Sequence, residues 1–199
     1  MIERRRLLKL SLSVFGVSAV APNAYAQDDI IGAILEAQKV SVAPETPVVE
    51  PKWLSLHNVH TEEKLEAVYW ERGAYVPDAL VALNKVLRDY RTGDVAPMNV
   101  GLFDLLGDIH RKTETQKAFQ VISGYRSPAS NALLSERSGE VAKHSLHMDG
   151  KAMDIYLEDV ALDRLRAAAL TIQRGGVGYY PESRFVHVDV GPVRRWQGT

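Results

Sequence analysis

Residues 145–157 read Ser-Leu-His-Met-Asp-Gly-Lys-Ala-Met-Asp-Ile-Tyr-Leu, and this stretch carries the clearest information about the fold. It begins as a polar loop that contains His147 and ends in the apolar run 152–157, which predicts a β-strand. Gly150 lies between the two parts and allows the loop to turn back on the strand. We therefore expect the imidazole of His147 to approach the carboxylate of Asp154.

A second imidazole follows near the C-terminus, in the sequence Phe-Val-His-Val-Asp of residues 185–189. Because side chains alternate between the two faces of a strand, His187 and Asp189 should share a face. The chain has no cysteine, so a metal site must use His, Asp or Glu ligands. Three such ligands with a free fourth position are typical of catalytic zinc. A polar loop beside a strand, without a metal, fits the same spacing.

The remaining histidines have simpler interpretations. His57 and His60 belong to a predicted hairpin and lack an acidic partner at a suitable spacing, so we expect them on a strand surface. His110 is expected as a favourable positive charge near the C-terminus of a helix. His144 is expected to be exposed.

Hydrophobic periodicity over the rest of the chain predicts an α+β domain. Strands and helices are expected in the order hairpin, two helices, strand, helix, strand, helix and two final strands, at residues 54–60 with 65–70, 77–90, 101–112, 118–123, 129–139, 152–157, 159–173, 177–180 and 184–190. Helices come mainly first and strands later. We therefore predict a small antiparallel sheet that carries the zinc site and is flanked by helices.

The first 52 residues predict export and a tether. Residues 1–26 have a basic start, an apolar run and the small-residue site Ala24-Tyr-Ala26, as secretory signals do. The sequence Arg4-Arg-Arg-Leu-Leu-Lys9 resembles a twin-arginine export signal, and an ordinary secretory signal is the alternative. Residues 27–52 contain three prolines and no steady period, which is typical of an extended tether. The folded domain is predicted at residues 53–199, in the periplasm.

Composition excludes several classes of protein. Hydrophobic residues make up 46% of the chain and charged residues 25%, which is ordinary for a globular protein. The net charge of -1 and the scattered basic residues argue against nucleic-acid binding. The apolar run of the signal is too short for a confident membrane span, so we expect no stable span after its removal. The oligomeric state is left open.

Three motifs in order give the chain a family resemblance. They are Ser-Gly-Tyr-Arg-Ser at 123–127, the stretch 145–154 and His-Val-Asp at 187–189. Together they resemble the D-Ala-D-Ala carboxypeptidase-type zinc peptidases, a superfamily that includes the hedgehog signalling domain. Within this superfamily, the two C-terminal segments 176–180 and 185–196 are most similar to the murein endopeptidase K branch.

The resemblance implies a zinc peptidase acting on peptidoglycan. Its metal ligands would be His147, Asp154 and His187, and its substrate the cross-links between diaminopimelate residues of stem peptides. A DD- or LD-carboxypeptidase is an alternative activity. A non-catalytic, metal-containing module that binds cell wall is the alternative from another class.

The proton-transfer group does not carry over from the resemblance, because Arg184 stands where many relatives have an acid three residues before the late histidine. Asp189 and Glu182 remain as candidates for the base. Asp189 is preferred because it shares a strand face with His187, although it is also suited to orienting a histidine ligand. Glu182 is otherwise a solvated loop carboxylate.

Three further residues are predicted to meet the substrate. Arg126 follows a strand in a tight turn, where its guanidinium would bind a peptide carboxylate or stabilise the developing oxyanion; an ordinary ion pair is the alternative. Ser145 lies two residues before His147 and is expected to hydrogen-bond the site or the substrate. Tyr125 is expected to line the pocket, and core packing explains it equally well.

Overall fold

The computed structural model describes residues 50–137 and 142–199, all of which belong to one compact unit, residues 49–199. The export signal predicted at 1–26 and the tether up to residue 49 lie outside the described residues. Among the described helices, none is both long and apolar enough to cross a membrane.

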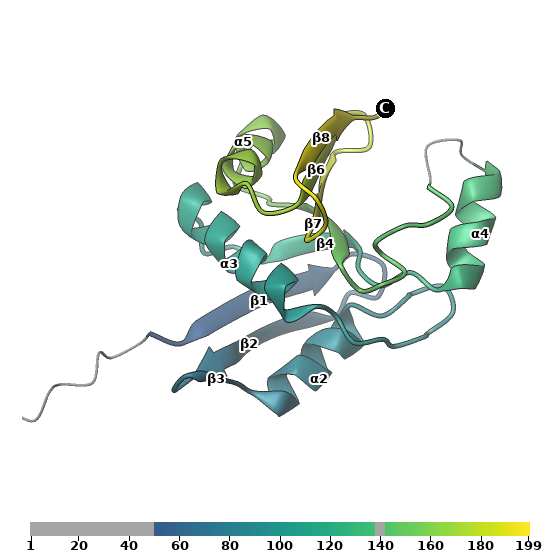
Figure 1. Ribbon diagram of the computed structural model, residues 1–199. Coiled ribbons are helices and arrows are strands. Elements are labelled where there is room, and N and C mark those ends of the chain that lie inside the picture. Colours follow the sequence, from purple (N-terminus) through teal and green to yellow (C-terminus); the bar gives the residue numbers. More distant parts are fainter. Residues whose placement is uncertain (1–49, 138–141) are drawn as a thin grey trace, which may run out of the picture. The chain divides into compact units, whose positions relative to one another are not determined.

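The domain is built on one mixed sheet of eight strands (Figure 1). The strands lie in the order β3-β2-β1-β4-β5-β7-β6-β8. Their bounds are β1 Lys52–Asn58, β2 Lys64–Glu71, β3 Ala74–Tyr75, β4 Phe119–Ser123, β5 Ala152–Tyr156, β6 Gly176–Tyr180, β7 Phe185–Asp189 and β8 Arg194–Gln197. The α+β class and the hairpin of β1 with β2 are confirmed.

The prediction of a small antiparallel sheet is wrong in two respects. The N-terminal hairpin joins the same sheet, because β1 pairs with β4. This pair is parallel, since β2, β3 and two helices intervene and return the chain to the starting edge. The second parallel pair joins β6 to β8. Strand β8 carries Arg, Arg, Trp and Gln, which lack the apolar alternation of a strand, and it was therefore not predicted.

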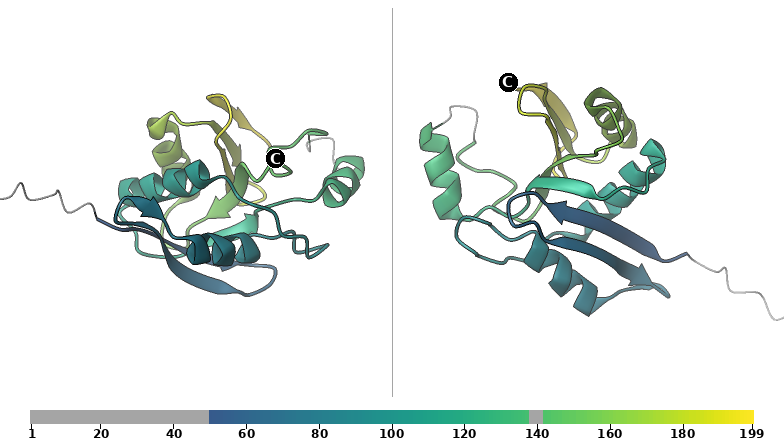
Figure 2. Two further views of the ribbon diagram at one scale, coloured as in Figure 1. Left: turned by 60° about the horizontal axis from the view of Figure 1, so that its bottom comes forward. Right: turned by 180° about the vertical axis from the view of Figure 1, so that it is seen from behind.

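Helices α2 (Pro77–Val86), α3 (Val100–Thr113) and α5 (Leu162–Ile172) lie along one face of the sheet, and α4 (Pro128–Arg137) stands to the side (Figures 1 and 2). Helix α5 begins three residues later than residue 159, where the sequence analysis put its start. Asp159 instead accepts a hydrogen bond from Thr115 Oγ1, and Leu157 forms an isolated bridge with Val160.

Alternation along β5 and β7 gives the sheet two chemically different faces. Met153, Ile155, Val186 and Val188 are fully buried in the hydrophobic core, under the helices. The intervening side chains, which include Asp154 and His187, point to the opposite face. One pair of neighbouring strands therefore supplies both core and candidate site.

The histidines of the hairpin lie away from the site. His57 is partly buried on β1, but its Nε2 lies 3.1 Å from Glu62 Oε2, so the expectation that it lacks an acidic partner is wrong. His60 is exposed in the turn after β1, where it stacks on Tyr90. The expectation of a charged His110 is wrong: its ring is buried against Phe119, and burial lowers its pKa. A side chain in the core cannot act as a solvated helix-end charge.

Candidate metal centre

Three side chains converge on the face of the sheet opposite the helices. Asp154 on β5 is the register partner of His187 on β7, so the two side chains lie side by side. His147 reaches them from the turn that precedes β5, and Gly150 (φ 64°) closes this turn. An added Cβ on Gly150 would lie 2.4 Å from the carbonyl oxygen of Pro97, so the turn is packed too closely for any other residue.

The ligand atoms of the three residues form a small triangle. His187 Nδ1 lies 2.8 Å from Asp154 Oδ1 and 3.2 Å from His147 Nε2, and His147 Nε2 lies 3.3 Å from Asp154 Oδ1. Ligand atoms about 2.0–2.2 Å from a tetrahedral zinc are roughly 3.3 Å apart. The triangle therefore has the size that such an ion requires, and the three residues could hold a metal.

Hydrogen bonds on the outer sides of both imidazoles support this interpretation. His147 Nδ1 lies 2.8 Å from the carbonyl oxygen of Gly124, an acceptor, so Nδ1 must donate. His187 Nε2 lies 3.1 Å from Asp189 Oδ2. With these outer nitrogens protonated, a metal bound at the common centre would take the place of the proton that His187 Nδ1 shares with Asp154 and would meet the inner nitrogen of each ring. Metal-binding histidines have this arrangement.

The three side chains of the centre are buried, so the charge of each one depends on the charged groups beside it. Burial disfavours the charged form of Asp154, but the neighbouring His147 and His187 outweigh it and hold its pKa well below the usual range. Burial lowers the pKa of His147. Burial also opposes charge on His187, yet hydrogen bonds to Asp154 and Asp189 raise its pKa to about 9. In the metal-free site the two carboxylates therefore favour a positive charge on His187, which a bound cation would supply in place of the proton.

Asp189 lies behind His187, away from the ligand triangle. Its side chain is fully buried and accepts hydrogen bonds from Gly176 N, Gly191 N and both terminal nitrogens of Arg194. The shared strand face with His187 was predicted correctly. A carboxylate enclosed in this way has no path to a substrate, so the geometry favours the alternative role of orienting His187.

Glu182 does not approach the centre either. It is exposed in the turn between β6 and β7, as is Arg184, which has a left-handed backbone (φ 58°). Among the described residues that line the pocket over the triangle, Asp154 is the sole carboxylate. Neither candidate base of the sequence analysis therefore lines this pocket.

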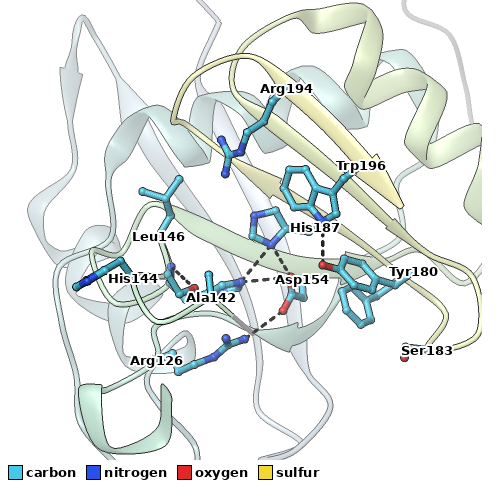
Figure 3. A pocket seen from close by; sticks show the side chains of 13 residues that line it. Arg126, Ala142, His144, Leu146, Asp154, Tyr180, Ser183, His187, Arg194 and Trp196 are labelled. Carbon is cyan, nitrogen blue, oxygen red and sulfur yellow. Dashed lines mark hydrogen bonds and ion pairs between the residues drawn. The ribbon is translucent and has the colours of Figure 1, made fainter. Parts of the chain in front are cut away.

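Arg126 is buried beside the centre, at the end of β4. Its guanidinium lies 3.5 Å from Asp154 Oδ2 and 3.3 Å from Ser123 Oγ, and it lines the pocket (Figure 3). Its Nε is buried with no hydrogen-bond partner in the described part of the chain. An ion pair with Asp154 and a spare donor thus coexist in one side chain.

The two other predicted substrate contacts differ in position. Ser145 lines the pocket, and its Oγ lies 3.4 Å from His147 N. Tyr125 instead packs against the hydrophobic core and does not line the pocket, so the prediction that it contacts substrate is not supported. Its neighbour Gly124 holds this segment against Leu87: an added Cβ would lie 2.5 Å from the Leu87 carbonyl oxygen.

The pocket has a volume of about 380 Å³ and an aromatic wall that the sequence analysis missed. This wall consists of Tyr180, Phe185 and Trp196, with Arg194 beside it, and His144 lies across the pocket from it (Figure 3). The Trp196 ring lies 5.1 Å from the His187 ring, and Arg194 lies over the indole. The aromatic residues at the end of the chain were the available signal, but only the β6–β8 pairing brings Trp196 to the centre.

A buried His, Asp and His triangle below an open pocket is a site of the metal-dependent hydrolase kind. Comparison with known proteins narrows the class. Residues 46–196 match the family model described as peptidoglycan L,D-endopeptidase MepK. The chain belongs to this family of peptidoglycan peptidases.

Individual relatives agree with the family match. The chain is 42% identical over 166 residues to peptidoglycan L,D-endopeptidase MepK of Escherichia coli strain K12, which covers 83% of this chain and 90% of the relative. The protein of the same name from Shigella flexneri gives the same values. The probable peptidoglycan L,D-endopeptidase MepK of Haemophilus influenzae is 37% identical over 169 residues, with 84% and 90% covered.

Proposed function

We propose that the protein is a zinc-dependent peptidoglycan endopeptidase that cuts amide bonds in the cross-links between stem peptides, outside the cytoplasmic membrane. The observation that carries the proposal is the ligand triangle, in which outer hydrogen bonds turn two imidazoles so that their inner nitrogens lie beside Asp154 Oδ1. The relatives' names supply the substrate class. The diaminopimelate cross-link remains the expected bond.

The chemistry follows from the residues around that triangle. When bound, zinc polarises the scissile carbonyl and lowers the pKa of water from ~15.7 toward ~7. Hydrolysis consumes one water: its oxygen bonds to the carbonyl carbon, the C–N bond breaks, and the amine leaves with a proton. Asp189 orients His187, and the carbonyl oxygen of Gly124 orients His147.

Arg126 is the proposed substrate anchor. Its guanidinium lines the pocket beside Asp154, where it suits a carboxylate of the stem peptide or the developing oxyanion. Ser145 is proposed as a polar contact on the same side of the pocket. Export by the twin-arginine route is proposed from residues 4–9 alone.

The test is digestion of defined, cross-linked muropeptides with product identification by mass. An endopeptidase converts a cross-linked dimer into two monomers, whereas a carboxypeptidase releases one amino acid from a stem. His147→Ala is expected to abolish both zinc content and cutting, and His57→Ala, which changes a histidine outside the site, to change neither. A zinc-loaded wild-type protein that binds cell wall without cutting any bond would support the non-catalytic module instead.

A further inference from the structure

We propose that Tyr180 is a further catalytic residue, whose hydroxyl donates a hydrogen bond to the oxyanion that develops on the scissile carbonyl. The inference rests on the proposed peptidase function. It begins from the pocket lining, where Asp154 is the sole carboxylate among the described residues. Hydrogen-bond donors and cations stabilise the negative charge that develops on the scissile carbonyl oxygen, so the donors that line this pocket are the candidates.

One contact directs the Tyr180 hydroxyl. Trp196 Nε1 lies 2.8 Å from Tyr180 Oη, and an indole nitrogen can only donate. Tyr180 Oη is thus the acceptor of this bond and keeps its own hydrogen for a second partner. In the described part of the chain no residue accepts that hydrogen. In Figure 3 the hydroxyl end of Tyr180 points toward the side of the pocket where Asp154 and His187 lie.

The Tyr180 ring is held firmly in this position. It stacks on Phe185 with ring centroids 4.5 Å apart, and Gly198 packs so closely that an added Cβ would lie 2.3 Å from the tyrosine ring. A donor that is already oriented needs no reorganisation when charge develops, and this is what makes oxyanion contacts effective.

Gly178 makes the arrangement possible. It is the register partner of both His187 on β7 and Trp196 on β8. Because it has no side chain, the indole lies across it: an added Cβ would be 2.6 Å from the Trp196 ring. Trp196 thereby contacts the His187 ring on one side and the Tyr180 hydroxyl on the other.

Beside Arg126, which is already paired with Asp154, His144 is the competing donor, since it also lines the pocket. It is exposed, and no hydrogen bond within the described residues fixes its ring. Tyr180 is the better oriented of the two, so we assign the role to Tyr180.

The test compares Tyr180→Phe, which removes only the hydroxyl, with Tyr179→Phe, whose ring lies under Arg166 away from the pocket. Zinc content, kcat and KM on a cross-linked muropeptide are measured, together with the Kd of an analogue in which a phosphinate replaces the scissile amide. Tyr180→Phe should lower kcat by about 10²–10³-fold and weaken phosphinate binding at least about tenfold, with KM and zinc content unchanged. Trp196→Phe, which keeps a ring but loses the donor, should lower kcat by a smaller factor, about tenfold.

Each outcome of these measurements either supports the role of Tyr180 or overturns it. Unchanged kcat in Tyr180→Phe while the wild type cuts overturns the role of Tyr180 and leaves the peptidase proposal intact. A raised KM with unchanged kcat assigns Tyr180 to substrate binding and likewise overturns the role, as does a loss of kcat in His144→Gln alone. If the wild type neither cuts nor binds the phosphinate, both proposals fail together.

Discussion

At the scale of single residues, Asp189 is the side chain whose predicted role the structure changes most. It shares a face with His187, as period-two alternation predicts, yet its carboxylate is enclosed by Gly176, Gly191 and Arg194. Alternation along a strand determines on which face of the sheet a side chain lies, but not which other residues cover that face. A base and an orienting group thus have the same sequence signature here.

The variant Asp189→Asn separates the two roles. It keeps the shape of the side chain but removes the anionic acceptor of the His187 Nε2–H, so metal affinity should fall by about 10- to 100-fold, with activity following the zinc content. Zinc affinity is measured by competition with a chromogenic chelator. The matched control is Asp149→Asn, which changes an exposed carboxylate in the loop of His147 and should bind zinc like the wild type. Full zinc affinity with lost turnover in Asp189→Asn would restore the role of base.

A buried carboxylate away from the centre makes a prediction about pH. Burial disfavours the charged form of Asp89, but hydrogen bonds from Ser130, Ser127 and the backbone of Arg91 prevail and lower its pKa to about 2. A lowered folded-state pKa stabilises the protein above the unfolded value near 4, and this stabilisation is lost as the pH falls toward 2. Its size is on the order of 2–3 kcal/mol.

Asp89→Asn tests this by urea unfolding between pH 6 and pH 2.5. The free energy of unfolding of the variant should lie below that of the wild type at pH 6, and the gap should narrow toward pH 2.5. Asp94→Asn, which changes an exposed carboxylate in the same turn, should cost less at pH 6. A gap for Asp89→Asn that widens on acidification would contradict the assignment.

At the scale of elements, the pairing of β6 with β8 positions Trp196 in the aromatic wall of the pocket. Gly178→Ala places a methyl group 2.6–2.8 Å from the Trp196 indole, so the ring must move. We expect the variant to lose roughly 1–3 kcal/mol of stability, as overpacked sites do, and to lose the hydrogen bond to Tyr180. Urea unfolding and tryptophan fluorescence measure the two effects.

A double-mutant cycle tests whether the added methyl group of Gly178→Ala clashes with Trp196. If Trp196 is the obstacle, Gly178→Ala should cost little when it is added to Trp196→Ala. A full and additive cost in the double variant would show that the methyl group clashes elsewhere.

The sequence predicted most elements of this domain because their apolar periodicity is strong. Helix α3 and the hairpin of β1 with β2 were expected near their observed bounds. Strand β8 was missed because a strand that faces a polar pocket on one side and solvent on the other has no apolar alternation. Its neighbours across the sheet, rather than its own residues, stabilise it.

At the scale of the whole molecule, the metal should act as a clamp on three separate parts of the chain. The loop of His147 contacts β7 through the His187 side chain, and its backbone carbonyls accept hydrogen bonds from Asn99 N and Val190 N. Ligand binding to the folded state alone contributes about 2.7 kcal/mol at a concentration of 100 Kd. For a domain of this size that corresponds to roughly 5–10 °C in Tm.

Calorimetry measures how much the bound metal raises the Tm of the domain. Dialysis against a chelator should lower Tm by about that amount, and zinc should restore it. In His147→Ala the Tm should be lower and should not respond to either treatment. A wild-type Tm that is indifferent to both chelator and zinc would exclude a metal held by these three residues.

The sequence by itself determined the three candidate ligands and the family resemblance, because a histidine, a glycine turn and an aspartate on a strand are a local pattern. It also determined that β5 and β7 each present one apolar and one polar face. The tertiary structure decided the direction and extent of the sheet, the burial of Asp189, the packing of Tyr125 against the core, and the aromatic wall around Trp196. Periodicity specifies which face of an element is apolar, whereas the neighbours that cover each face depend on contacts between residues far apart in the chain.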